Sequence, residues 1–132
     1  MKARAAELKA QARRASAEEK EASDRAEFEA KIADMPQPDR SMAERLHAIV
    51  SEAAPDLRPR LYYGQPGWAR DGKVIVFFRS GLMDKARYST LGFSVSAGLD
   101  EPEGFWPTSY ALEHLSEATA AAIADRVAKA AT

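Results

Sequence analysis

Three stretches of the chain carry apolar residues at the spacing of an α-helix. In the first, Phe28, Ile32 and Met35 recur at positions i, i+4 and i+7, which places them on one helical face. Asp24 and Glu27 have the spacing of a capping box, in which a side-chain acceptor begins the helix and a carboxylate follows three residues later. The pattern therefore predicts a helix that begins at Asp24.

Two further helices are expected, one before and one after a β-rich region. The second runs over residues 39–53, where apolar residues keep the helical spacing, and Pro55 closes it. The last follows Ser116, a favourable N-cap residue, and places Ile123 and Val127 on its inner face.

Between residues 61 and 110 the pattern changes to short β-rich runs separated by glycine and proline. The expected strands cover residues 60–63, 67–70, 73–79, 87–94 and 108–112. A turn over Gly64–Gly67 and a hairpin at Asp71-Gly72 join the first three. The run Val74–Phe78 is apolar on both faces, so we expect it to be central and covered.

Short connections imply antiparallel pairing, and helices that bracket the strands in sequence are expected on one face of the sheet. The predicted fold is therefore α+β: an antiparallel sheet of about five strands with N-terminal helices and a C-terminal helix packed on one face. Residues 1–23 contain Leu8 as the only large apolar residue after Met1. They are expected to form a polar arm, helical or disordered, ahead of a single domain over 24–132.

The charge pattern does not decide the role of this arm. Its first 16 residues contain five basic residues and one acidic residue, and an acidic stretch follows over residues 17–30. Such a segment is either an interaction arm or a solvated tail, and the solvated tail is the more common case.

Composition excludes several classes of site. Lys and Arg number 19 against 20 Asp and Glu, a formal net charge of −1, and there is no cysteine. Disulfides and thiolate metal sites are therefore excluded, and nucleic acid is not expected as a partner. No run approaches the ~20 apolar residues of a membrane helix, and the start has no secretory apolar region, so a cytoplasmic protein is expected.

No catalytic constellation is apparent. Phosphate-binding glycine loops and the Gly-x-Ser-x-Gly elbow are missing from the sequence. All acidic residues lie in polar stretches, so no carboxyl group with a pKa raised by burial is expected. The sequence therefore predicts a protein that is not an enzyme.

Residues 54 to about 129 carry a family resemblance. The features are the turn motif Tyr63-Gly64-Gln65-Pro66 followed by Trp68, the Gly72-Lys73 hairpin and the strand Leu91-Gly92-Phe93. In these the chain resembles the YdhG-like family, also called the DUF1801 domain. The resemblance implies an α+β fold related in shape to frataxin. For one branch of the family it also implies an intracellular iron chaperone, which would bind iron weakly.

Iron held without thiolates needs carboxylate or imidazole ligands. The one local acidic cluster, Asp100, Glu101 and Glu103, is the candidate metal site, and a solvated loop is the alternative. His114, which follows Glu113, could join this loop as a further ligand but is more simply a surface histidine. Iron is therefore the one cofactor that the sequence suggests.

A second metal motif is weaker. Glu44 and His47 match Glu-x-x-His, the ligand pair of di-iron bundles, but only one copy is present. Both lie opposite the apolar stripe of their own helix, at ~100° per residue. They are therefore expected to face water.

The aromatic residues suggest a different function. Three helices can cover only one face of the sheet, so the other face is available to a partner or a flat ligand. The candidates for that surface are Tyr63, Trp68 and Tyr88, with Arg79 and Arg87 beside them. Ordinary sheet packing is the simpler interpretation. The alternative to iron handling is therefore a protein-interaction or small-ligand-binding module.

Overall fold

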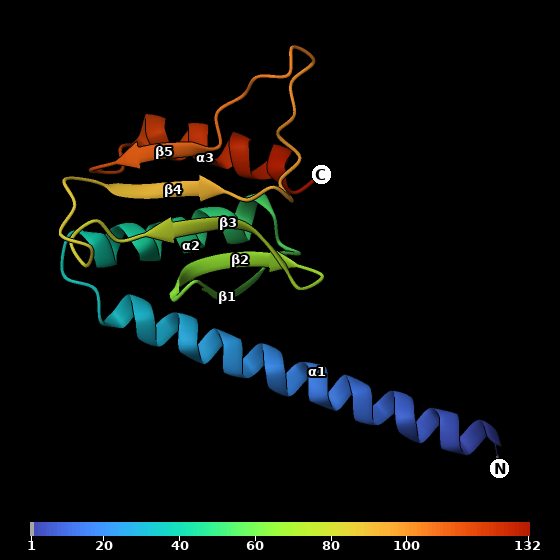
Figure 1. Ribbon diagram of the computed structural model, residues 1–132. Coiled ribbons are helices and arrows are strands. Elements are labelled where there is room, and N and C mark those ends of the chain that lie inside the picture. The colour runs from blue at the N-terminus through green and yellow to red at the C-terminus, as the bar shows by residue number, and fades with distance from the viewer. Residues whose placement is uncertain (1) are drawn as a thin grey trace.

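The computed structural model describes residues 2–132 and confirms the α+β class (Figure 1). Its elements are α1 (Lys2–Ala33), α2 (Asp39–Ala53), β1 (Arg58–Tyr62), β2 (Gln65–Arg70), β3 (Lys73–Arg79), β4 (Ser89–Phe93), β5 (Ser109–Leu112) and α3 (Glu117–Ala130). Ser116 caps α3 as expected, because its hydroxyl oxygen accepts a hydrogen bond from the backbone amide of Thr119.

The five strands form one antiparallel sheet in the order β1-β2-β3-β4-β5. Across its centre Trp68 pairs with Val76, and Val76 pairs with Phe93. These three side chains are buried and belong to the hydrophobic core. The register therefore assigns one face of the sheet, the core face, to the interior.

Two hairpin turns set this register. In the first, Tyr63 and Gly64 have φ of 49° and 77°, and in the second Asp71 and Gly72 have φ of 53° and 78°. Positive φ at both central residues gives a turn whose twist matches that of the flanking strands. The expected turn over Gly64–Gly67 is therefore placed too late in the chain, since the turn is centred on Tyr63 and Gly64, and Gln65 already belongs to β2.

Helices lie on one side of the sheet. In Figure 1 the arrow of β3 passes in front of α2 and that of β5 in front of α3, and no described helix lies in front of these strands. The C-terminal part of α1 packs along β1 and β2, where Phe28 meets the Trp68 ring at 5.5 Å between centroids. The opposite face of the sheet is uncovered.

The long helix α1 departs from the expected boundary. It runs without a break through Asp24, so the Asp24–Glu27 pair does not begin a helix. The preceding residues are rich in alanine, which has the highest helix propensity, and a helix once formed extends at little cost. Phe28 and Ile32 are buried, whereas almost all residues before Asp24 are exposed.

Within residues 2–132, none of the helices combines the length and the apolar character needed to cross a bilayer. The longest, α1, is mostly polar along its exposed half.

Candidate functional site

The uncovered face is built around Phe77, near the centre of β3. Its direct partners in the neighbouring strands are Gly67 in β2 and Gly92 in β4. A Cβ atom on Gly92 would lie 2.2 Å from the Phe77 ring, so the ring lies directly over this glycine. Glycine inside a strand weakens it and often marks a place where another group approaches closely.

Tyr62 extends this ring surface towards the β1–β2 turn. Its ring centroid lies 5.0 Å from that of Phe77 and 4.6 Å from that of Tyr63. These rings line a shallow depression of about 420 Å³. We call this surface the aromatic face; it comprises Tyr62, Tyr63, Gln65, Phe77, Arg79 and Asp84.

Polar groups border the rings. Arg79 Nε donates to Asp84 Oδ2 at 2.5 Å, which fixes both side chains at the edge of the depression. The side-chain oxygen of Gln65 is buried and accepts no hydrogen bond from any residue within 2–132. An unpaired buried acceptor is costly, so a donor on a bound ligand would be favourable here.

Tyr63 has an unusual backbone and an unusual exposure. Its φ of 49° lies in the left-handed region, where bulky residues are rare, and its side chain is 91% exposed. Asn or Gly would suit this turn position better. The ring contacts Tyr62 but contributes little buried surface, so folding alone does not account for a tyrosine here.

Trp68 does not belong to this surface, contrary to the sequence interpretation. It is 1% exposed and lies on the core face. Its indole Nε1 donates to His47 Nδ1 at 3.0 Å, so the indole N–H has a partner inside the protein.

Arg87 and Tyr88 also lie apart from the aromatic face. They precede β4 and line a separate small cavity of about 210 Å³ beside α2. The Arg87 guanidinium lies 5.1 Å from the centroid of the Tyr88 ring, and its Nη1 lies 3.7 Å from Glu113 Oε1. Of the five residues proposed for a ligand surface, only Tyr63 and Arg79 line the aromatic face.

His47 does not face water as expected. The C-terminal part of α1 covers it, with the Phe28 ring at 5.0 Å between centroids. Burial is the main reason that its pKa is lowered; Arg25 lowers it further, and Glu29 acts in the opposite direction. Glu44, its expected partner, is exposed.

The acidic loop is attached to α3. Glu101 Oε1 accepts from Lys129 Nζ at 2.6 Å, and this hydrogen bond is the main reason that the Glu101 pKa is lowered. His114 is exposed beyond β5. Throughout residues 2–132, no three Asp, Glu or His side chains converge as metal ligands would. Asp100 and Glu103 therefore do not form a ready-made site with Glu101.

One buried acid was missed by the sequence interpretation. Asp39, at the start of α2, is 3% exposed. Its Oδ2 accepts from Ser80 Oγ at 2.6 Å and from the Leu82 amide at 3.0 Å. The carboxylate ties the β3–β4 loop to α2, and nothing in the local sequence indicates burial because both donors are more than 40 residues away.

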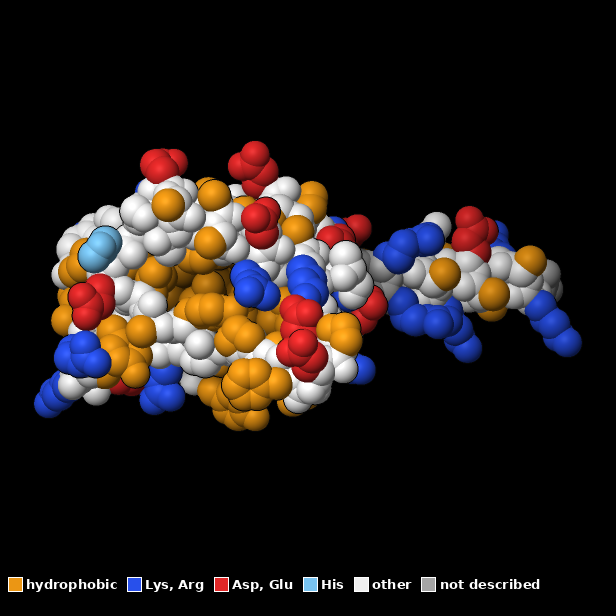
Figure 2. Space-filling model, turned by 90° about the horizontal axis from the view of Figure 1, so that it is seen from above, with side chains coloured by type: hydrophobic (Ala, Val, Ile, Leu, Met, Phe, Trp, Pro, Cys, Tyr) orange, Lys and Arg blue, Asp and Glu red, His pale blue; other side chains and the backbone are white. Residues whose placement is uncertain are grey.

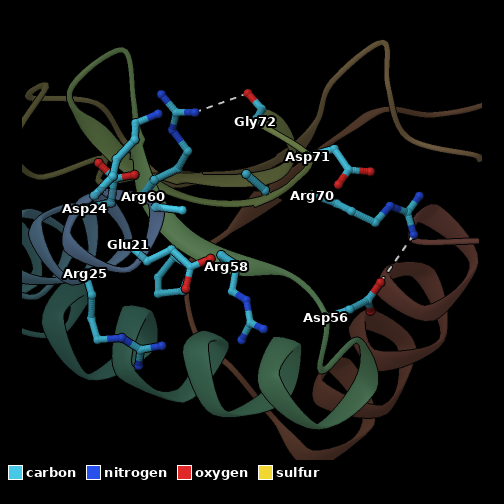
Figure 3. A pocket seen from close by; sticks show the side chains of 13 residues that line it. Glu21, Asp24, Arg25, Asp56, Arg58, Arg60, Arg70, Asp71 and Gly72 are labelled. Carbon is cyan, nitrogen blue, oxygen red and sulfur yellow. Dashed lines mark hydrogen bonds and ion pairs between the residues drawn. The ribbon is translucent and has the colours of Figure 1, made fainter. Parts of the chain in front are cut away.

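A cavity of about 500 Å³ lies between α1 and the first two strands (Figure 3). Five basic and four acidic residues line it: Lys20, Arg25, Arg58, Arg60 and Arg70 against Glu21, Asp24, Asp56 and Asp71. Arg70 faces Asp56 at 3.6 Å, and Arg60 donates to the Gly72 carbonyl. These charges nearly cancel, so the cavity has no strong preference for a cation or an anion.

Together these features define a small α+β protein whose antiparallel sheet leaves one aromatic face uncovered. We found no family model, curated protein or solved structure that matches this chain. The family resemblance in the turn motif therefore gains no support from them, and the function is argued from the surfaces themselves.

Proposed function

We propose that this protein is a non-catalytic binding module whose aromatic face takes a flat, ring-bearing small ligand. The observation that carries the proposal is the pair of glycines beside Phe77 on the uncovered face. The Phe77 ring rests on the backbone of Gly92, while Val74 and Tyr62 fill the space above Gly67. The ring remains partly exposed, so a flat group can stack on it.

Two further observations support a ring with a hydrogen-bond donor. Tyr63 projects at the rim of the depression, in a backbone conformation that folding does not favour. Gln65 offers a buried acceptor with no partner in the described part of the chain. A heteroaromatic N–H would satisfy this acceptor while its ring stacks on Phe77 or Tyr62.

Amide NMR on the full chain tests this proposal, with indole and adenine as flat donors and cyclohexanol as a non-flat control. We expect saturable shifts at Tyr62, Tyr63, Phe77 and Gly92 with the flat probes only. Tyr63→Ala should weaken their binding about fivefold or more, since aromatic stacking contributes roughly 1 kcal/mol or more.

The matched control is Phe105→Ala, which removes a ring that is 86% exposed and lies outside the aromatic face. Its affinity for the flat probes should equal that of the unaltered protein. Shifts scattered over the surface, or equal binding by the Tyr63 and Phe105 variants, would contradict the proposal.

Iron handling, which the family resemblance implies, has less geometric support because Glu101 is already paired with Lys129. Anaerobic titration with ferrous iron, followed by calorimetry and NMR, separates the two functions. Saturable binding with shifts centred on Asp100–Glu103 would favour iron handling over a ring-binding module.

A further inference from the structure

A second surface lies at the opposite edge of the molecule, between α3 and β5. Leu91, Phe93 and Leu112 line it from the sheet, and Ala118, Ala122 and Ile123 line it from the helix. Figure 2 views the molecule from this side and shows hydrophobic side chains gathered in a hollow, with Lys or Arg side chains next to it. The groove has a volume of about 430 Å³, within the range of small-molecule sites.

The groove is left open by the way α3 packs. This helix packs principally against α2. On the side that faces the groove, Ala118 and Ala122 carry only methyl groups, which are too short to fill the space. An apolar hollow of this kind at the surface is a site for an apolar group.

Two polar groups in the same lining restrict what that group can be. The Arg126 guanidinium makes no hydrogen bond or ion pair with any other residue in the range 2–132. The nearby Glu101 carboxylate is already bonded to Lys129. The hydroxyl oxygen of Tyr110 is buried and likewise has no partner within that range. The lining of the groove is therefore mostly apolar, with one positive charge at Arg126 and with Thr119 and Tyr110 as its other polar residues. The unpaired Tyr110 hydroxyl oxygen has almost no exposed surface.

We propose that this groove binds a small carboxylic acid with an apolar tail. The tail lies against Leu91, Phe93 and Ile123, and the carboxylate accepts hydrogen bonds from Arg126 and from the Tyr110 hydroxyl. A guanidinium matches a carboxylate geometrically, and charge-assisted hydrogen bonds are stronger than neutral ones. The groove lies on the helix-covered side of the sheet, so this proposal and the aromatic face are independent.

Octanoate, octanol and acetate test the proposal on the full chain by NMR, because they separate tail from charge. Octanoate should give saturable shifts at Tyr110, Ala122 and Ile123. Octanol should bind at the same residues about five- to tenfold more weakly, and acetate should not bind measurably, since the tail supplies most of the affinity.

Variants separate the contribution of the apolar tail from that of the carboxylate charge. Ala122→Phe fills the groove from an exposed helix position and should abolish octanoate binding, whereas Ala121→Phe, exposed on the same helix outside the lining, should not. Arg126→Gln should reduce octanoate binding about five- to tenfold and leave octanol unchanged. Arg14→Gln, on the exposed arm, is the matched control for charge.

Tyr110→Phe separates binding from folding. It removes a hydroxyl with no described partner, so the protein should be no less stable, yet octanoate should bind more weakly. Equal affinity of octanoate and octanol, or equal binding by the Ala122→Phe and Ala121→Phe variants, would overturn the proposal. So would groove signals that broaden with protein concentration alone, since a second copy of the chain would then cover the groove.

Discussion

The two faces of the sheet are made by the same strands and differ in the surroundings and the exposure of their aromatic rings. On the core face, Trp68 and Phe93 are buried within the hydrophobic core. On the aromatic face, Phe77 has glycine on both sides and remains partly exposed. The rings of the first face exclude water from a core, and those of the second present a surface to it.

This difference shows why aromatic residues in a strand cannot be assigned a role by type. Each core-face ring buries apolar area and so stabilises the fold. Phe77 rests on the backbone of Gly92, a strand position with no side chain of its own, and its other partner, Gly67, is packed by Val74 and Tyr62. A surface that weakens the sheet and exposes rings is better explained by binding than by stability.

The largest expected effect is on the core face. Trp68→Ala should lower the free energy of unfolding by about 3–5 kcal/mol, because it leaves a cavity and removes the donor to His47. Chemical denaturation measures this change. Such a loss is a large share of the ~5–15 kcal/mol by which a domain is stable.

Phe105→Ala is the comparison for the loss of a ring as such, and its effect should stay within about 0.5 kcal/mol. Trp68→Phe keeps a ring and should cost less than Trp68→Ala. If Trp68→Ala were as mild as Phe105→Ala, the division into a core face and an aromatic face would be wrong.

The sequence predicts the fold well and the site only in part. Hydrophobic periodicity and the Asp71-Gly72 turn are local signals, so the class, the bounds of α2 and β3 and the cap of α3 are correct. Which face Trp68 occupies depends on its register with Val76, which the sequence of β2 alone does not contain.

His47 shows the same limit for a helix. The apolar stripe of α2 predicts what that helix buries by itself, and on that basis His47 is exposed. The structure adds Phe28 from α1, which covers the imidazole from outside the stripe. Sequence patterns do not predict contacts between elements that are distant in the chain, such as the hydrogen bond between Ser80 and Asp39.

A smaller effect is expected where the aromatic face rests on glycine. Gly92→Ala places a methyl group within 2.2 Å of the Phe77 ring atoms and forces that ring to move. We expect a loss of about 1–3 kcal/mol in the free energy of unfolding, as for overpacking elsewhere, together with weaker binding of indole.

Gly98→Ala provides a milder control, since the nearest atom to its added Cβ, the Thr132 carbonyl oxygen, would lie 3.3 Å away, which is a tight contact and not an overlap. If Gly92→Ala folded and bound indole like the unaltered protein, Phe77 would not need its glycine neighbour, and the ring surface would lose its main support.

The next expected effect is a pH dependence of the stability, which arises from His47 beside the core face. The His47 pKa is lowered by folding, so between that value and the ordinary value of 6.5 the unfolded chain takes up a proton that the folded chain does not. Stability is therefore full above pH 6.5 and falls as the pH is lowered through this window, by no more than about 1.4 kcal/mol per pH unit.

Denaturation curves between about pH 7 and about pH 5 measure this slope. His47→Gln should flatten it, whereas Glu101→Gln should leave it unchanged, because the lowered Glu101 pKa acts only below its ordinary value of 4.5. An equal slope in the His47 variant would show that this imidazole is not sheltered by α1.

The smallest effect on stability, with the opposite sign, is expected at the rim of the aromatic face. Tyr63→Asn replaces an exposed ring at positive φ with a residue that tolerates this conformation, so stability should stay equal or rise by up to about 1 kcal/mol. Binding of indole should nevertheless fall. Asp71→Asn makes a change at the corresponding position of the second hairpin turn and should leave binding intact. If the substitution raises stability and weakens indole binding, the role of Tyr63 is in binding. If it lowers both stability and affinity, Tyr63 serves the fold alone.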